Sequence, residues 1–189
     1  MRYAPEHNEE ARARILEAAS RLFREHGVEG VGLAKIMAEA DLTVGTFYTH
    51  FKSKEALLQE ALIQSLNAWN EALRQTLLAG DLELAVRTYL SAEHRDAPAT
   101  GCPAAALAAE VARRPHPTRK TFASEVGLGL DVLVECLSQR RGTKVSRAEA
   151  AAFFGLLVGT LQLARATPDR TASAAILDAG IRAALVLAQ

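Results

Sequence analysis

Apolar residues recur every three or four positions along almost the whole chain, and this spacing constrains the fold more than any other feature. If residues 8–26 form a helix, one of its faces carries Ile15, Leu16, Ala19, Leu22 and Phe23. Apolar residues make up 49% of the chain, with alanine and leucine dominant, and strand-like alternation does not recur. The pattern therefore predicts an all-α protein.

Breaks in this pattern divide the chain into about nine helices. Gly27 stands where a left-handed residue would end the first helix. The second helix is expected to end near Ala40 and the third to cover residues 44–51, and six mostly longer helices follow. We expect two domains: a three-helix domain over residues 1–53 and a six-helix domain over residues 54–189.

Composition and charge exclude several classes of protein. The formal net charge is zero, which argues against a broadly cationic coat. No apolar run reaches the length of a membrane span and the first residues lack a signal-peptide core, so we expect a cytoplasmic protein without a membrane partner. The two cysteines, Cys102 and Cys136, give neither a disulfide framework nor a zinc spacing. We assign no metal, no cofactor and no enzymatic activity, because no nucleophile–base pair or paired carboxylates stand out.

The stretch LTVGTFYTHFKSK, residues 42–54, is the most informative segment for function. It holds three of the chain's ten aromatic residues and no acid. It follows the second predicted helix after a turn of about three or four residues, which is the helix-turn-helix arrangement. In that motif the second helix enters the DNA major groove with its first residues at the base edges. A solvated helical hairpin or structural adaptor is the alternative, but neither needs an acid-free face.

The side chains of this stretch divide between a core face and a free face. Phe47 and Phe51 are four residues apart and are expected in the small three-helix core. The hydroxyl, aromatic and basic side chains can reach bases or phosphates, and a glycine allows close approach to the DNA backbone. The residues that we expect to contact DNA are Lys35, Thr43, Val44, Gly45, Thr46, Tyr48, His50 and Lys54.

Residues 9–58 resemble the N-terminal domain of the TetR family of one-component transcriptional regulators. The resemblance rests on the run from Ala19 to Gly27 and on IMAEADLTVGTFYTHFKSKEALL, in which the spacing G-T-F-Y-x-H-F-x-S-K-x-x-L is specific. Asp41 departs from the family, which usually has a glycine before the recognition turn. The rest of the chain matches the family only in helix number and length, because the family's C-terminal domains vary with their ligands.

The resemblance implies a homodimer that binds a palindromic operator in double-stranded DNA and leaves it when a small-molecule effector binds. The sequence gives the dimer a physical reason, because the predicted helices over residues 148–166 and 168–187 look too apolar to face water. Gly155 and Gly159 would let such helices approach closely. Burial of both helices within one subunit is the alternative. The family favours a repressor, and an activator of the same fold stays open.

The large aromatic residues of the second domain are candidates for lining an effector pocket. These candidates are Trp69, Tyr89, Phe122 and Phe153, although each is also a common type of core residue. Few charged residues accompany them. We therefore expect an apolar or aromatic effector.

Cys102 gives an alternative mode of regulation. In TGCPAAALAAE it precedes Pro103, which suits the first turn of a helix. Free N–H groups at a helix start favour a thiolate, so the position predicts a thiol more reactive than one in a core. A helix that starts in this way also resembles a branch of the family that senses electrophiles or oxidants. The alternative to an effector pocket is therefore a redox or electrophile sensor acting through Cys102.

Overall fold

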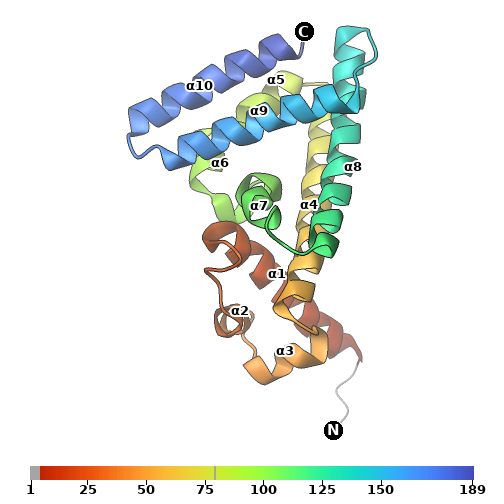
Figure 1. Ribbon diagram of the computed structural model, residues 1–189, viewed down its shortest axis with the longest axis vertical. Coiled ribbons are helices and arrows are strands. Elements are labelled where there is room, and N and C mark those ends of the chain that lie inside the picture. The colour runs from red at the N-terminus through yellow and green to blue at the C-terminus, as the bar shows by residue number, and fades with distance from the viewer. Residues whose placement is uncertain (1–4, 79) are drawn as a thin grey trace.

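The computed structural model describes residues 5–78 and 80–189, and every regular element within them is helical (Figure 1). Three helices come first: α1 (Pro5–His26), α2 (Leu33–Glu39) and α3 (Val44–His50). The remaining predicted helices are α4 (Lys54–Leu78), α5 (Leu82–Tyr89), α7 (Pro103–Val111), α8 (His116–Arg141), α9 (Arg147–Ala166) and α10 (Arg170–Leu187). The all-α fold and the order of these helices confirm the prediction.

The run RDAPATGCP after His94 predicts a loop, because two prolines and a glycine interrupt the helical spacing, but the structure has further helical elements there. α6 spans Ala92–Asp96, and its N-cap Ser91 accepts a hydrogen bond from the His94 N–H at 3.1 Å. A turn of 3-10 helix, η1, follows at Pro98–Thr100. The loop prediction was wrong because Arg165, far away in α9, donates to the His94 carbonyl at 2.7 Å and so satisfies a backbone group of this short helix.

The first three helices form a small head around a shared core (Figure 1). α1 packs against both α2 and the start of α4, and α2 packs against α3. Gly27 ends α1 with a φ of +75°, as the sequence predicts. The side chains that close the head are fully buried, and they include Ile15, Phe23, Ile36, Met37, Phe47 and Leu58.

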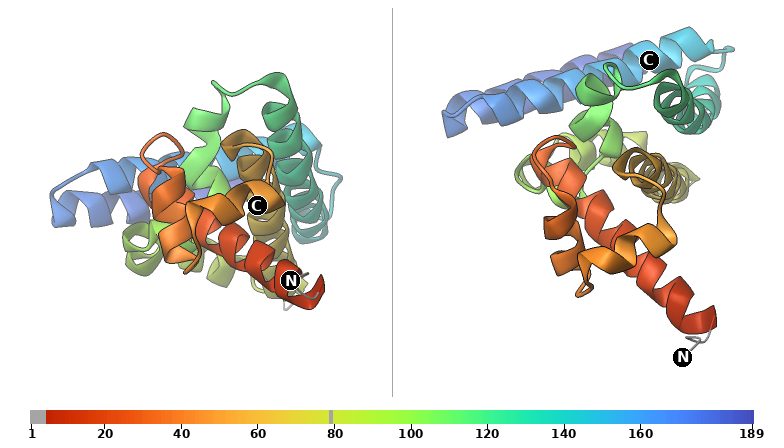
Figure 2. Two further views of the ribbon diagram at one scale, coloured as in Figure 1. Left: turned by 90° about the horizontal axis from the view of Figure 1, so that it is seen from below. Right: turned by 60° about the horizontal axis from the view of Figure 1, so that its bottom comes forward.

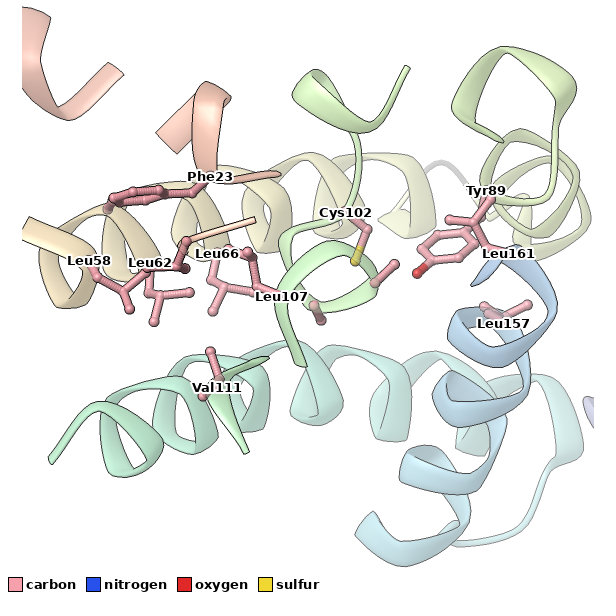
Figure 3. Packing of buried hydrophobic residues seen from close by; sticks show 14 of the residues in the cluster. Phe23, Leu58, Leu62, Leu66, Tyr89, Cys102, Leu107, Val111, Leu157 and Leu161 are labelled. Atoms are coloured by element: carbon pink, nitrogen blue, oxygen red, sulfur yellow. The ribbon is translucent and has the colours of Figure 1, made fainter. Parts of the chain in front are cut away.

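The other helices form a body that carries the head at one end. α4 leaves the head and runs beside α8, and α9 and α10 pack as a pair across the far end (Figures 1 and 2). α7 lies between these layers, and its Leu107 and Val111 pack near Leu66 of α4 (Figure 3). A capping box at Ser146 and Glu149 starts α9. Over the described residues, no helix combines the length and apolar character that crossing a bilayer requires.

Candidate nucleic-acid interface and effector cavity

The turn between α2 and α3 fixes how α3 is presented. The Leu42 N–H donates to the Met37 carbonyl at 2.8 Å and closes the turn. Asp41 has a left-handed backbone conformation with φ +54°, and its carboxylate lies 3.2 Å from the Arg14 guanidinium. A left-handed residue favours glycine because glycine has no Cβ. The turn therefore explains physically why a glycine is usual at position 41.

α3 has one face in the core of the head and one face in solvent. Phe47 is fully buried, and its ring stacks on that of Phe51 with 5.7 Å between the centroids. On the other face, Tyr48 is 67% exposed and Val44 is 44% exposed. Figure 1 places α3 at the end of the molecule opposite α9 and α10. The predicted split of this helix into a core face and a free face is therefore present.

The threonines of this region form a local hydroxyl cluster. Thr43 is the N-cap residue of α3, but its hydroxyl makes no capping bond and instead pairs with that of Thr46 at 3.0 Å. Thr49 is also exposed, and its hydroxyl donates to the Thr46 carbonyl at 2.7 Å. We did not predict Thr49, although its position three residues after Thr46 on a helix was the available signal.

Gly45 has open space around it. A Cβ added there would meet the Thr43 hydroxyl oxygen at 3.9 Å as its nearest atom, so the fold itself does not require a glycine. An exposed helical glycine costs about 1 kcal/mol relative to alanine. Packing within the subunit therefore does not explain this glycine.

Basic groups flank α3 on its neighbouring elements. Lys35 is exposed on α2, and Lys54 is the first residue of α4, where the Ser53 hydroxyl accepts from the Ala56 N–H at 3.1 Å. His50 is half-buried, and its pKa is lowered by burial and secondarily by the Arg12 charge. A neutral His50 would contact a phosphate through a ring N–H and not through charge. In the part of the chain that the structure describes, no group of His, Cys, Asp and Glu residues is arranged to hold a metal ion.

A cavity of about 420 Å³ opens in the body between α4, α5, α6 and η1. Its walls carry Trp69, Ala72, Leu73, Thr76, Ala85, Thr88, Tyr89, Ser91, Glu93, His94, Ala97, Thr100 and Gly101. Two of the four predicted aromatic residues, Trp69 and Tyr89, therefore line it. The other two lie elsewhere: Phe153 is fully buried in the core, and Phe122 is half-buried against that core.

His94 is one of the polar residues that line this cavity. Its ring stacks on Trp69, with 5.4 Å between the centroids and 24° between the planes. Its Nε2 accepts from the Cys102 N–H at 2.9 Å, and its Nδ1 lies 2.6 Å from the Tyr89 carbonyl. Because Nε2 is an acceptor, the proton of the neutral ring is on Nδ1. Burial lowers the His94 pKa, which favours this neutral form.

Cys102 lies where the sequence placed it, at the N-cap of α7 with Pro103 in the first turn. The thiol is fully buried, and Figure 3 shows its sulfur and the Tyr89 hydroxyl turned toward each other. Burial raises the Cys102 pKa, while the Tyr89 hydroxyl and the N–H groups of Ala105 and Ala104 oppose this effect. The predicted position is correct, but the thiol in this conformation is not the readily ionised one that we expected.

Comparison with known proteins places the head in a family. Residues 15–61 match the family model described as bacterial regulatory proteins, tetR family. The chain is 41% identical over 73 residues to the HTH-type transcriptional regulator TtgR of Pseudomonas putida, which is 39% of this chain and 34% of TtgR. It is 42% identical over 53 residues to UidR of Escherichia coli, which is 28% of this chain and 27% of UidR. The matched region thus spans about a third of the length of these curated relatives.

Solved structures extend the likeness to the whole chain. SCO4454, a TetR-family regulator from Streptomyces coelicolor, has a TM-score of 0.70 and 25% identity over 96% of this chain and 97% of its own. The reduced form of E. coli NemR has a TM-score of 0.75 and 21% identity over 92% and 94%. FadR from Bacillus subtilis in complex with stearoyl-CoA has a TM-score of 0.67 and 18% identity over 91% and 96%. The last two likenesses concern the fold alone.

Proposed function

Because this chain is a TetR-family transcriptional regulator, we propose that it is a homodimeric repressor that binds a palindromic operator and leaves it when a small apolar effector binds. The exposed face of α3 carries this proposal. The helix is held by Phe47 in the core of the head, and it turns Tyr48 and Val44 toward solvent. A helix presented in this way fits a major groove.

The proposed contacts follow from what each side chain offers. Val44, Thr46 and Thr43 start the helix, so their methyl and hydroxyl groups would face base edges. Tyr48 and His50 would donate to phosphates, as would the ammonium groups of Lys35 and Lys54. The free N–H groups at the start of α4 would hold the same phosphate as Lys54. Gly45 would lie closest to the DNA backbone.

Selection of bound sequences from random double-stranded DNA tests this assignment. We expect a palindrome whose half-sites are separated by one or a few helical turns. Tyr48→Ala should then weaken binding to the selected site by about tenfold while the fold stays intact. Leu84→Ala is the matched control, because Leu84 is 53% exposed on α5, in the body. Unchanged affinity of Tyr48→Ala in a gel-shift titration would remove the DNA-contact role of α3.

The proposed dimer interface is the exposed face of α9 and α10. Leu163 and Val186 are 63% and 68% exposed there. A Cβ added at Gly155 or Gly159 would have nothing within 4 Å. Two glycines in a helix cost about 2 kcal/mol relative to alanine, and packing within the subunit does not explain them. Close approach of a helix from a second copy does explain them.

Sedimentation of a Gly159→Arg variant tests the dimer. The arginine should produce a folded monomer that no longer binds the palindrome, because a single head contacts half as many phosphates. Ala123→Arg is the control, because it adds the same side chain at an exposed position of α8. A Gly159→Arg protein that stays dimeric would place the interface elsewhere.

We further propose that residues 54–189 form the regulatory domain and that the cavity at Trp69 and His94 binds the effector. Its walls are mainly aromatic and aliphatic, which favours an apolar ligand. The FadR neighbour binds stearoyl-CoA, so acyl compounds belong beside aromatic ones in a screen. Trp69 is the only tryptophan of the chain, so its fluorescence reports binding in this cavity directly. A compound that binds there should also release the operator.

Regulation through Cys102 is a second candidate, favoured by the Tyr89 hydroxyl beside the thiol at a helix start. An electrophile with an activated double bond would form an S–C bond while the thiol proton moves to the neighbouring carbon. The thiol is fully buried, so an electrophile added to its sulfur would not fit at this site unless α7 moved. N-ethylmaleimide should release DNA from the wild type and from Cys136→Ser but not from Cys102→Ser. Equal release from all three proteins would exclude this route.

A further inference from the structure

The C-terminal end of α1 makes polar contacts with one segment of the body, residues 97–114, in addition to the packing of α1 against α4. The Nε of Arg24 donates to the Ala99 carbonyl at 2.7 Å. The Val28 N–H donates to the Glu110 carboxylate at 2.8 Å. We call these two contacts the α1 clasp. They join the head to η1 and α7, whereas α4 is the direct covalent connection between head and body.

The clasp is closely packed and includes one unfavourable charge contact. A Cβ added to Gly27 would overlap the Glu110 carboxylate, so the acid lies directly against the end of α1. The C-terminal end of a helix carries a partial negative charge, which repels a carboxylate. Beyond the clasp, Arg114 pairs with Glu29 at 2.5 Å, and Glu29 is mostly exposed.

The same segment forms one wall of the cavity. Thr100 and Gly101 line it directly, one and two residues after Ala99. The next residue, Cys102, donates its N–H to the His94 ring. A Cβ added at Gly101 would lie 2.7 Å from the His94 ring, so there is no free space between the ring and the segment. Any displacement of His94 must therefore break the hydrogen bond or move the segment.

We propose that residues 97–114 transmit occupancy of the cavity to the DNA-binding head by opening the α1 clasp. The inference rests on the proposed function, in which the effector releases the operator. A ligand that stacks on Trp69 displaces His94, and the segment moves with it and withdraws the Ala99 carbonyl from Arg24. α1 then loses these two contacts, and the head can shift relative to the body about the start of α4. The ligand favours the open clasp and DNA favours the closed one, so each weakens the binding of the other.

A double-mutant cycle on operator affinity tests this coupling. Gly101→Ala pushes the His94 ring away without a ligand and should weaken binding by at least about fivefold. In an Arg24→Ala background the contact with the Ala99 carbonyl is already lost, so the same change should have much less further effect. Arg113→Ala, an exposed arginine next to Arg114, is the control and should leave the effect of Gly101→Ala unchanged. Equal effects of Gly101→Ala with and without Arg24 overturn the proposal.

Hydrogen exchange on the protein without DNA gives a readout that does not depend on the proposed function. Gly101→Ala should speed exchange at the Val28 amide by about tenfold or more, because its acceptor moves away. Gly32→Ala is the control, because an added Cβ there meets nothing within 4 Å. If Gly101→Ala does not fold, Ala85→Phe replaces it, because Ala85 lines the cavity. Unchanged Val28 exchange refutes the clasp, whereas failure of the wild type to select DNA refutes only the proposed function.

Discussion

Asp41 offers a sharp test of how the turn before α3 is built. It holds a left-handed backbone conformation, φ +54°, in which a side chain is disfavoured. Asp41→Gly and Asp41→Ala both remove the carboxylate that lies near Arg14. The difference in unfolding free energy between the two variants therefore reports the backbone alone. We expect the glycine variant to be the more stable one.

The size of this difference follows from two opposing effects. A left-handed conformation costs a non-glycine residue about 1–2 kcal/mol. Glycine gains more freedom in the unfolded chain, which costs about 0.4–1 kcal/mol. The net preference for glycine at position 41 is therefore about 0.5–1 kcal/mol. At the exposed α4 residue Ala68 the backbone is right-handed, so Ala68→Gly should instead cost about 1 kcal/mol.

Thermal unfolding followed by circular dichroism measures both comparisons. For a chain of this length, a difference of 0.5–1 kcal/mol corresponds to about 1–4 °C in Tm. All variants must be compared at one protein concentration, because the Tm of the proposed dimer would depend on concentration. If Asp41→Ala is as stable as Asp41→Gly or more stable, the left-handed conformation at this turn is not the constraint that we describe.

Three further predictions concern packing, pH and salt. Gly180→Ala should destabilise the packing of α9 on α10 by up to about 2 kcal/mol, because an added Cβ overlaps Thr160. Thr160→Ala in the same chain should restore most of the lost free energy of unfolding, measured in urea. The pKa of His94 is lower in the folded protein than in the unfolded chain. The neutral ring therefore supports the folded state fully above about pH 6.5, and the free energy of unfolding decreases as the pH falls from there toward the folded pKa. The urea concentration at the unfolding midpoint should therefore decrease less between about pH 7.5 and 5 in His94→Gln than in the wild type. Equal decreases would contradict a lowered His94 pKa. Lys35→Ala should reduce the slope of log affinity against log salt by about two, one phosphate for each subunit of the proposed dimer. An unchanged slope would mean that Lys35 contacts no phosphate.

The helices could be predicted from the sequence wherever local rules decide the structure. Gly27 ends α1 and Pro103 starts α7 because backbone conformation at these positions depends on the residue itself. α6 could not be predicted in this way. It is one short helix beside prolines, and Arg165 of α9 satisfies its His94 carbonyl. Such a long-range contact leaves no periodic signal in the sequence.

The two candidate sites differ in how much of them the sequence reveals. The free face of α3 was predictable, because Phe47 and Phe51 mark the buried side and fix where Tyr48 points. The cavity was predictable only in part. Size alone selected Trp69 and Phe153, but the rotation of α9 turns Phe153 into the core.

Two connections between head and body have different mechanical consequences. α4 is a long helix braced along its side by α8, so on its own it would carry the head as a rigid extension of the body. The α1 clasp adds a second attachment at the other side of the head, through Arg24 and Glu110. With both attachments closed, the orientation of α3 is fixed relative to α9 and α10. With the clasp open, rotation about the start of α4 becomes possible. In a dimer joined through α9 and α10, a small rotation of each head changes the separation of the two reading helices, and that separation decides whether both reach successive grooves.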